Sequence, residues 1–64
     1  MRNQANLRHL RMKRDVYIYA RKTGDNKWCN DILSELEGEN YHELIQLLQN
    51  EDYQAATVWI ENNY

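Results

Sequence analysis

The chain has few of the residues that interrupt or cross-link a small fold. Its 64 residues include no proline, two glycines and a single cysteine, Cys29. One cysteine excludes an intrachain disulfide, and a lone thiol fits the reducing cytosol. A domain of this size buries only about 60% of the surface that its unfolded chain exposes. We therefore expect one small domain over residues 1–64 that depends on regular helix packing or on association as a homodimer.

Long hydrophobic runs are also missing. No apolar stretch approaches the roughly 18 residues that span a bilayer, and the first residues are polar and basic, unlike a secretory signal. A hydrophobic content of 42% is nevertheless adequate for a globular fold and argues against disorder. We therefore expect a folded, cytoplasmic protein without a membrane partner.

The residues that catalysis or metal binding would need are few and scattered. Cys29 has no local signature of a nucleophile with His9 or His42 as its base, and no glycine-rich turn offers an oxyanion hole. No C-x-x-C or H-x3–5-H spacing is present, and the isolated Gly24 and Gly38 cannot form a phosphate-binding loop. We expect no enzymatic activity, no cofactor and no metal site.

Positive charge is missing from the second half of the chain. All eight Lys and Arg precede Trp28, and only two acids share that segment, which gives it a net charge of +6. Residues 28–64 contain eight acids and neither Lys nor Arg, a net charge of −8. A split of this kind indicates a charged partner, or two halves of the chain that meet each other.

What the sequence does contain is helical periodicity, clearest at Asn40–Gln49. Apolar residues there follow the i, i+3, i+4, i+7 spacing of one helical face. Asn40 and Glu43 have the spacing of a capping box, in which each side chain bonds the backbone N–H of the other. Gly24 and Gly38 both stand where the C-terminal cap of a helix is expected.

Two further segments have one apolar face each. The segment that ends at Gly38 has Asp25 or Asn26 as its predicted N-cap, and its face comprises Trp28, Cys29, Ile32, Leu33 and Leu36. Asp52 is the predicted cap of the last segment, whose face comprises Tyr53, Ala56, Trp59 and Ile60. Because this last segment also contains β-branched residues, a terminal strand stays open as an alternative.

The segment Gln4–Lys22 supports two interpretations. As a helix, it gathers Ala5, His9, Met12, Val16, Tyr19 and Ala20 on one side and its cations on the other. Leu7, Leu10, Tyr17 and Ile18 lie among the cations, and apolar residues on a charged face are typical of an interface. As a strand, Val16–Lys22 would form a hairpin with residues 27–32, since Val16-Tyr17-Ile18-Tyr19 is β-prone.

From these patterns we predict an all-α fold of three or four short helices in one small domain. The alternative is an α+β fold with a β-hairpin at residues 16–32 packed on helices. The predicted helical core comprises Met12, Val16, Trp28, Ile32, Leu33, Leu36, Tyr41, Leu44, Ile45, Leu48, Tyr53, Ala56, Trp59 and Ile60.

On function, we predict a small non-enzymatic interaction protein that binds and regulates or inhibits a larger protein through charge complementarity. A compact chain of this kind suits a phage or mobile-element product. The acidic partner face would comprise Glu35, Glu39 and Glu43. The alternative is a nucleic-acid-binding module, since cations along one flank can follow a phosphate backbone. The residues predicted to contact a partner or nucleic acid are Arg8, Arg11, Arg14, Tyr17, Arg21 and Lys22.

Overall fold

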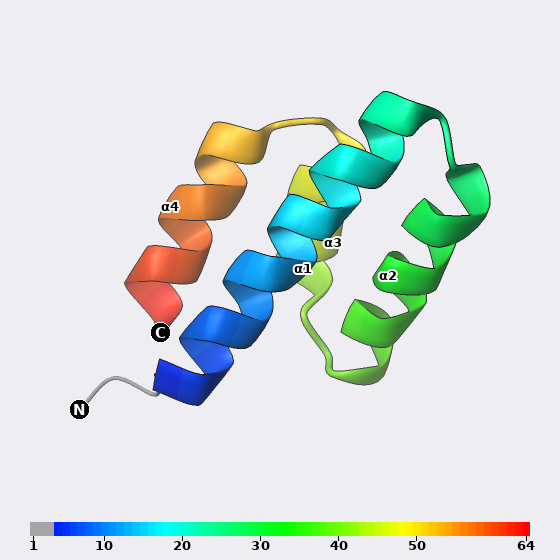
Figure 1. Ribbon diagram of the computed structural model, residues 1–64. Helices are drawn as coiled ribbons and strands as arrows, with labels where there is room; N and C mark the ends of the chain where they lie inside the picture. The colour runs from blue at the N-terminus through cyan, green and yellow to red at the C-terminus, as the bar shows by residue number, and fades with distance from the viewer. Residues whose placement is uncertain (1–3) are drawn as a thin grey trace.

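The computed structural model describes residues 4–64, which form four α-helices and no strand (Figure 1). The helices are α1 (Gln4–Thr23), α2 (Asn26–Gly38), α3 (His42–Gln49) and α4 (Tyr53–Asn63). α1 lies between α2 and α4 and packs against both, and α3 packs against the same two helices. The all-α prediction is therefore confirmed. The alternatives with strands at residues 16–32 and at the end of the chain are wrong, because both regions are helical.

The first turn shows how two adjacent residues end one helix and begin the next. Gly24 has a left-handed backbone with φ of 75°, and its N–H donates to the Arg21 carbonyl at 3.2 Å. The N–H of Asp25 donates to the Ala20 carbonyl at 2.9 Å, which completes a Schellman motif. The Asp25 carboxylate then accepts from the Trp28 N–H at 3.0 Å. The predicted caps at Gly24 and Asp25 are thus confirmed.

The second turn uses Asn40 where a glycine was expected. Gly38 remains helical, and Asn40 takes the left-handed conformation with φ of 65°. The N–H groups of Asn40 and Tyr41 donate to the carbonyls of Glu37 and Leu36, both at 3.0 Å. The predicted capping box is therefore wrong. Tyr41 is the N-cap of α3, and no side chain caps that helix. Asn40 instead ends α2 through its backbone N–H.

The third turn repeats the motif with Glu51 in the left-handed position, at φ of 59°. Its N–H donates to the Leu48 carbonyl and the Asp52 N–H donates to the Leu47 carbonyl, both at 3.0 Å. Asp52 then caps α4 by accepting from the Ala55 N–H at 3.2 Å, as predicted. The connections between helices are therefore only two or three residues long, which keeps consecutive helices antiparallel and adjacent.

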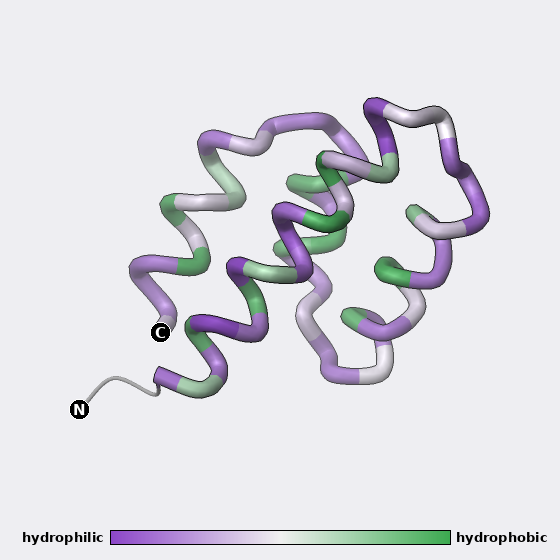
Figure 2. Tube along the Cα trace, in the orientation of Figure 1, coloured by the Kyte–Doolittle hydropathy of each residue, from purple (hydrophilic) through white to green (hydrophobic). Residues whose placement is uncertain are grey.

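The core differs from the prediction mainly on α1. Hydrophobic residues recur along each helix with hydrophilic stretches between them (Figure 2). The predicted core positions Met12 and Trp28 are exposed, at 56% and 38%. The other predicted members are buried or pack half-buried against the core. The buried residues are Leu7, Leu10, Tyr17, Ala20, Cys29, Ile32, Leu36, Leu44, Leu48, Ala56 and Ile60.

The inner face of α1 is interrupted by cations, which explains the error. Leu7, Leu10, Arg14 and Tyr17 follow a 3-4-3 spacing, so they lie on one side of the helix. The side chains of Lys13 and Arg14 are only 18% and 17% exposed. Their alkyl stems lie along the packed face while their charged ends reach neighbouring residues, as long cationic side chains commonly do. Leu7, Leu10 and Tyr17 are thus core residues rather than the predicted interface, and Ile18 is half-buried.

We predict that Tyr17→Ala and Tyr19→Ala differ sharply in stability, although the two tyrosines are two residues apart. Tyr17 is 1% exposed and Tyr19 is 59% exposed. Removing the buried ring should lower the free energy of unfolding by about 3–5 kcal/mol, and removing the exposed ring by under about 1 kcal/mol. Urea unfolding measures both variants. Tyr17→Leu, which keeps an apolar side chain, should fall between them, and equal effects at the two positions would contradict this core.

Gly24→Ala and Gly38→Ala should change stability in opposite directions. A Cβ added at either glycine meets no atom within 4 Å, so only the backbone conformation matters. Alanine is strained at the left-handed Gly24 and should lower the free energy of unfolding by about 1 kcal/mol. Alanine at the helical Gly38 should raise it by about 0.5–1 kcal/mol. The same sign of change at both positions in urea unfolding would show that the first turn has another geometry.

Candidate interaction surfaces

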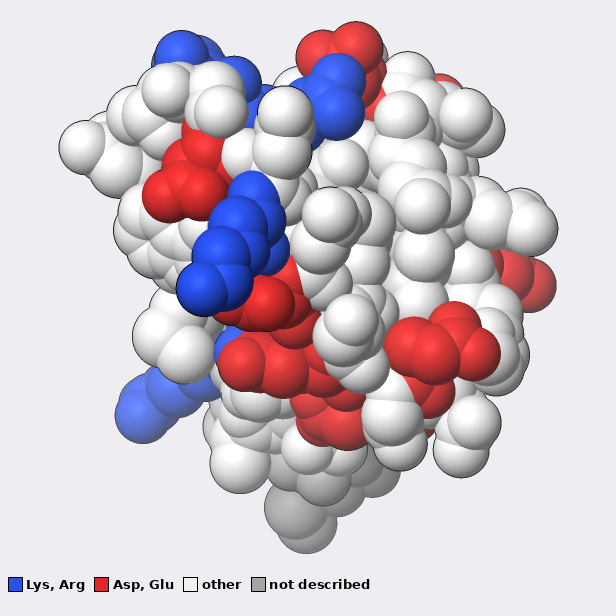
Figure 3. Space-filling model, turned by 90° about the vertical axis from the view of Figure 1, so that its right-hand side faces the viewer, with Lys and Arg blue, Asp and Glu red and all other residues white. Residues whose placement is uncertain are grey.

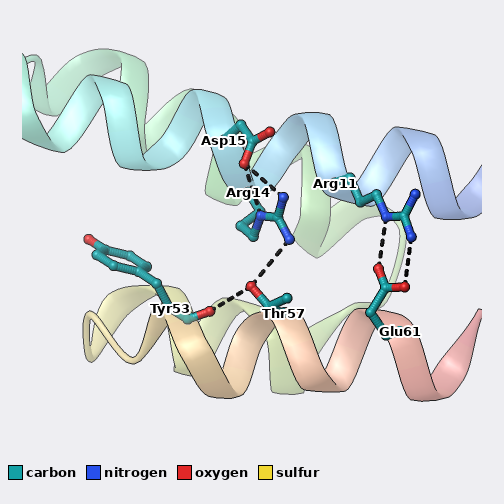
Figure 4. Close-up of polar contacts among 6 residues, drawn as sticks. All are labelled: Arg11, Arg14, Asp15, Tyr53, Thr57 and Glu61. Carbon is teal, nitrogen blue, oxygen red and sulfur yellow. Dashed lines mark hydrogen bonds and ion pairs between the residues drawn. The ribbon is translucent and has the colours of Figure 1, made fainter.

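The clearest polar contact of α1 is made by Arg11. Its Nε and Nη2 atoms donate to the two carboxylate oxygens of Glu61 on α4, at 2.8 and 2.7 Å (Figure 4). The side-chain hydrogen bond to Glu61 raises the pKa of Arg11. This two-pronged geometry is the strongest pairing of a guanidinium with a carboxylate. Arg11 is therefore engaged by residues of its own chain.

Arg14 lies one turn further along the same side of α1. Its guanidinium contacts the Asp15 carboxylate at 2.9 Å and donates to the Thr57 hydroxyl at 3.2 Å (Figure 4). The Thr57 hydroxyl donates in turn to the Tyr53 carbonyl at 2.9 Å. This chain of hydrogen bonds connects the half-buried cation to the backbone of α4.

Two more cations of α1 pair with carboxylates from the acidic half. Lys13 pairs with Glu35 of α2. Arg21 contacts Glu51, in the turn before α4, at 3.2 Å, and the hydrogen bond to that carboxylate raises its pKa. The cations of α1 thus reach acids on both sides of the helix. Of the two explanations of the charge split, the structure shows that the two halves of the chain meet.

Fewer cations of the predicted basic face are therefore available to a partner. Arg11, Arg14 and Arg21 have carboxylate partners, whereas Arg8 and Lys22 are exposed and have none within residues 4–64. The two free cations are 14 residues apart, a distance of roughly 21 Å along a helix. Arg2 lies outside the described residues.

Tyr17 was predicted to contact a partner, and the structure places it in the core instead. Its ring lies edge-on against Tyr53, with 6.5 Å between the ring centroids. Burial raises the pKa of its hydroxyl. A side chain that is almost fully covered cannot stack on a base or a partner residue.

The predicted acidic residues lie at the surface, although each has a contact within the chain. Glu35 pairs with Lys13, and Glu39 accepts from His9 at 2.9 Å. Glu43 accepts from the Trp59 indole N–H at 2.7 Å. These contacts use individual oxygens, and all three residues remain exposed.

Two further acids are exposed on α2, and their spacing of six residues places them on different sides of that helix. Asp31 is exposed on α2, and Glu37 lies 3.2 Å from His42. Seen from the side of α2, acidic side chains lie in several groups over the face, with cations at the top, on the left and beside the central acidic group (Figure 3). We call the set of Asp31, Glu35, Glu37, Glu39 and Glu43 the acidic surface.

Large apolar side chains are also exposed. Met12, Tyr19 and Trp28 are three of them, and the rings of Tyr19 and Trp28 meet edge-on at 6.0 Å. The sequence placed Met12 and Tyr19 on one side of the helix, because seven residues complete nearly two helical turns, and it assigned Met12 to the core. Val58 on α4 is 52% exposed and was assigned to no face by the sequence.

An aromatic cluster joins the start of α3 to the end of α4. The rings of Tyr41, Trp59 and Tyr64 lie 5.9–6.2 Å apart. A hydrogen bond with Tyr64, together with burial, raises the pKa of the Tyr41 hydroxyl to about 12. The cluster fixes the position of Trp59, whose indole N–H bonds Glu43.

Cys29 is buried, and no group of three or more His, Cys, Asp or Glu in residues 4–64 is arranged to hold a metal ion. Among the four helices described, none has the length and apolar character needed to cross a membrane. Comparisons of the chain with protein-family models, curated proteins and solved structures gave no match.

We predict that Tyr41 titrates well above an ordinary tyrosine. The folded protein holds this proton more tightly than the unfolded chain, whose tyrosine pKa is about 10. The free energy of unfolding should therefore lose this contribution as the pH rises from about 10 through about 12. NMR titration of Cζ-labelled tyrosine measures the pKa directly. In Tyr64→Phe, which lacks the hydrogen-bonding hydroxyl, the pKa of Tyr41 should fall toward 10; no change would contradict the contact.

Proposed function

We propose that this protein is a small non-enzymatic interaction protein, acting in the cytoplasm. It binds a basic region of a larger protein through its acidic surface and thereby regulates or inhibits that protein. The single observation that carries the proposal is the composition of this surface: α2 beyond Lys27, the following turn and α3 present five exposed acids and no Lys or Arg.

The internal contacts leave this surface negative. Lys13 is the one cation of α1 that pairs with a member of the acidic surface, and its partner Glu35 is still 54% exposed. His9 and His42 contact two other members, Glu39 and Glu37. A concentrated negative field steers a basic partner and accelerates encounter, and oppositely charged surfaces set the register of the complex.

The same contacts weigh against the nucleic-acid alternative. Affinity for a phosphate backbone rises with the number of cations that contact it and release counterions. The chain's own carboxylates occupy Arg11, Arg14 and Arg21, which leaves Arg8 and Lys22 of the predicted set. Two cations support only weak binding, with a shallow dependence on salt.

We expect a fluorescent lysine–serine peptide to bind this protein at about 150 mM salt, and a glutamate–serine peptide and duplex DNA not to bind. The double variant Asp31→Asn/Glu37→Gln should weaken binding by about three- to tenfold, as the loss of two surface charges implies. Fluorescence anisotropy measures the dissociation constants.

The matched control is the double variant Gln4→Lys/Thr23→Lys, which changes the net charge by the same amount at exposed positions of α1. Its affinity for the cationic peptide should stay within about twofold of that of the unmodified protein. Equal weakening by both double variants would mean that net charge, and not the acidic surface, determines binding. Tighter binding to DNA than to the peptide would favour the nucleic-acid alternative.

A further inference from the structure

A groove outside the acidic surface lies between the end of α3 and the outer side of α4. It has a volume of about 570 Å³, and its lining includes Leu47, Ala55, Val58 and Trp59. Volumes of this order are typical of sites that hold a small ligand or a few anchoring side chains. The apolar lining residues come from both helices, so the groove belongs to the packed α3–α4 pair.

The aromatic wall of the groove is held in place before anything binds. The indole N–H of Trp59 donates to Glu43 at 2.7 Å, and its ring packs against Tyr41 and Tyr64. Its backbone carbonyl accepts from the Asn63 side chain at 2.8 Å. A fixed tryptophan beside exposed apolar atoms suits a binding site, because little conformational freedom is lost when a partner arrives.

The carboxylate that lines the groove is that of Asp52, and Glu43 bonds the Trp59 indole N–H at the wall of the groove. Glu51 and Glu61 are already paired with Arg21 and Arg11 of α1. Neither α3 nor α4 contains Lys or Arg. Rim residues such as Gln54 and Asn62 are uncharged amides. A partner that buries an apolar side chain here therefore gains from cations close to that side chain.

We propose that this groove binds an amphipathic helical segment of a partner protein, with apolar anchors spaced three or four residues apart and Lys or Arg beside them. Such a segment inserts its anchors between Leu47, Val58 and Trp59 and directs its cations toward Asp52. Helices of this kind commonly dock in apolar grooves through anchors on one face. The inference deepens the proposed function, on which it rests, by naming the kind of segment that is bound.

The test uses the Trp28→Phe background, in which Trp59 is the one tryptophan that reports binding. The probe is a peptide of about 14 residues with leucine every three or four positions among lysines. We expect it to shift the Trp59 emission and to bind at least about tenfold more tightly than the analogue with serine for leucine. Val58→Asn, which keeps the charge and removes apolar surface, should abolish this difference.

The matched control is Met12→Gln, which replaces another exposed apolar side chain far from the groove along the chain. The affinity of this variant for the leucine–lysine peptide should equal that of the unmodified background. Equal binding of the leucine and serine peptides, weakened by Asp31→Asn/Glu37→Gln, would contradict binding in the groove and leave the proposed function standing. If neither peptide bound, both the groove proposal and the proposed function would be contradicted. Equal binding of a leucine–glutamate peptide would overturn the basic character of the segment. Self-association seen by light scattering and lost in Val58→Asn would make a second copy the occupant, and would also overturn the proposal.

Discussion

The structure depends on how α1 fits between α2 and α4. Its inner line of Leu7, Leu10 and Tyr17 is buried, yet Lys13 and Arg14 stand in the middle of that line. These cations are accommodated because Glu35 on one side and Thr57 on the other receive their charged ends. A cation held near a packed face without such a partner would be costly. The separation of charge along the sequence thus places carboxylates of the acidic half beside cations of the central helix.

The turns explain how so short a chain forms four helices with few special residues. Each turn includes a left-handed residue followed directly by the N-cap of the next helix, and the left-handed residues are Gly24, Asn40 and Glu51. Glutamate is an unusual choice, because a side chain disfavours this conformation. At the third turn the contact of Glu51 with Arg21 coincides with the strained position, so the turn also ties α1 to the start of α4.

Helix content and most core positions of α2, α3 and α4 could be predicted, because each has one apolar face. The cap of α4 at Asp52 was predicted, and the cap of α2 was narrowed to Asp25 or Asn26, of which the structure shows Asp25. The inner face of α1 could not, since two stripes satisfy the same helical period and the buried one includes Arg14. Partners such as Thr57 and Glu61 lie more than 40 residues away, beyond the reach of a local pattern. Asparagine is common both as an N-cap and in a left-handed turn. Asn40 takes the second role, because its N–H and that of Tyr41 bond the last carbonyls of α2. The groove escaped prediction for a similar reason, because Leu47 and Val58 become neighbours only through packing.

Most cations of α1 pair with carboxylates of the same molecule. The surface that we propose for a partner is therefore acidic and has an apolar groove beside it. The most direct measurement is the free energy of unfolding in urea, an uncharged denaturant, from about 10 to about 500 mM sodium chloride. If the basic helix is held by the acidic half, salt should screen these attractions and the free energy of unfolding should decrease. An increase with salt would mean that repulsion dominates and that the two halves do not meet as described.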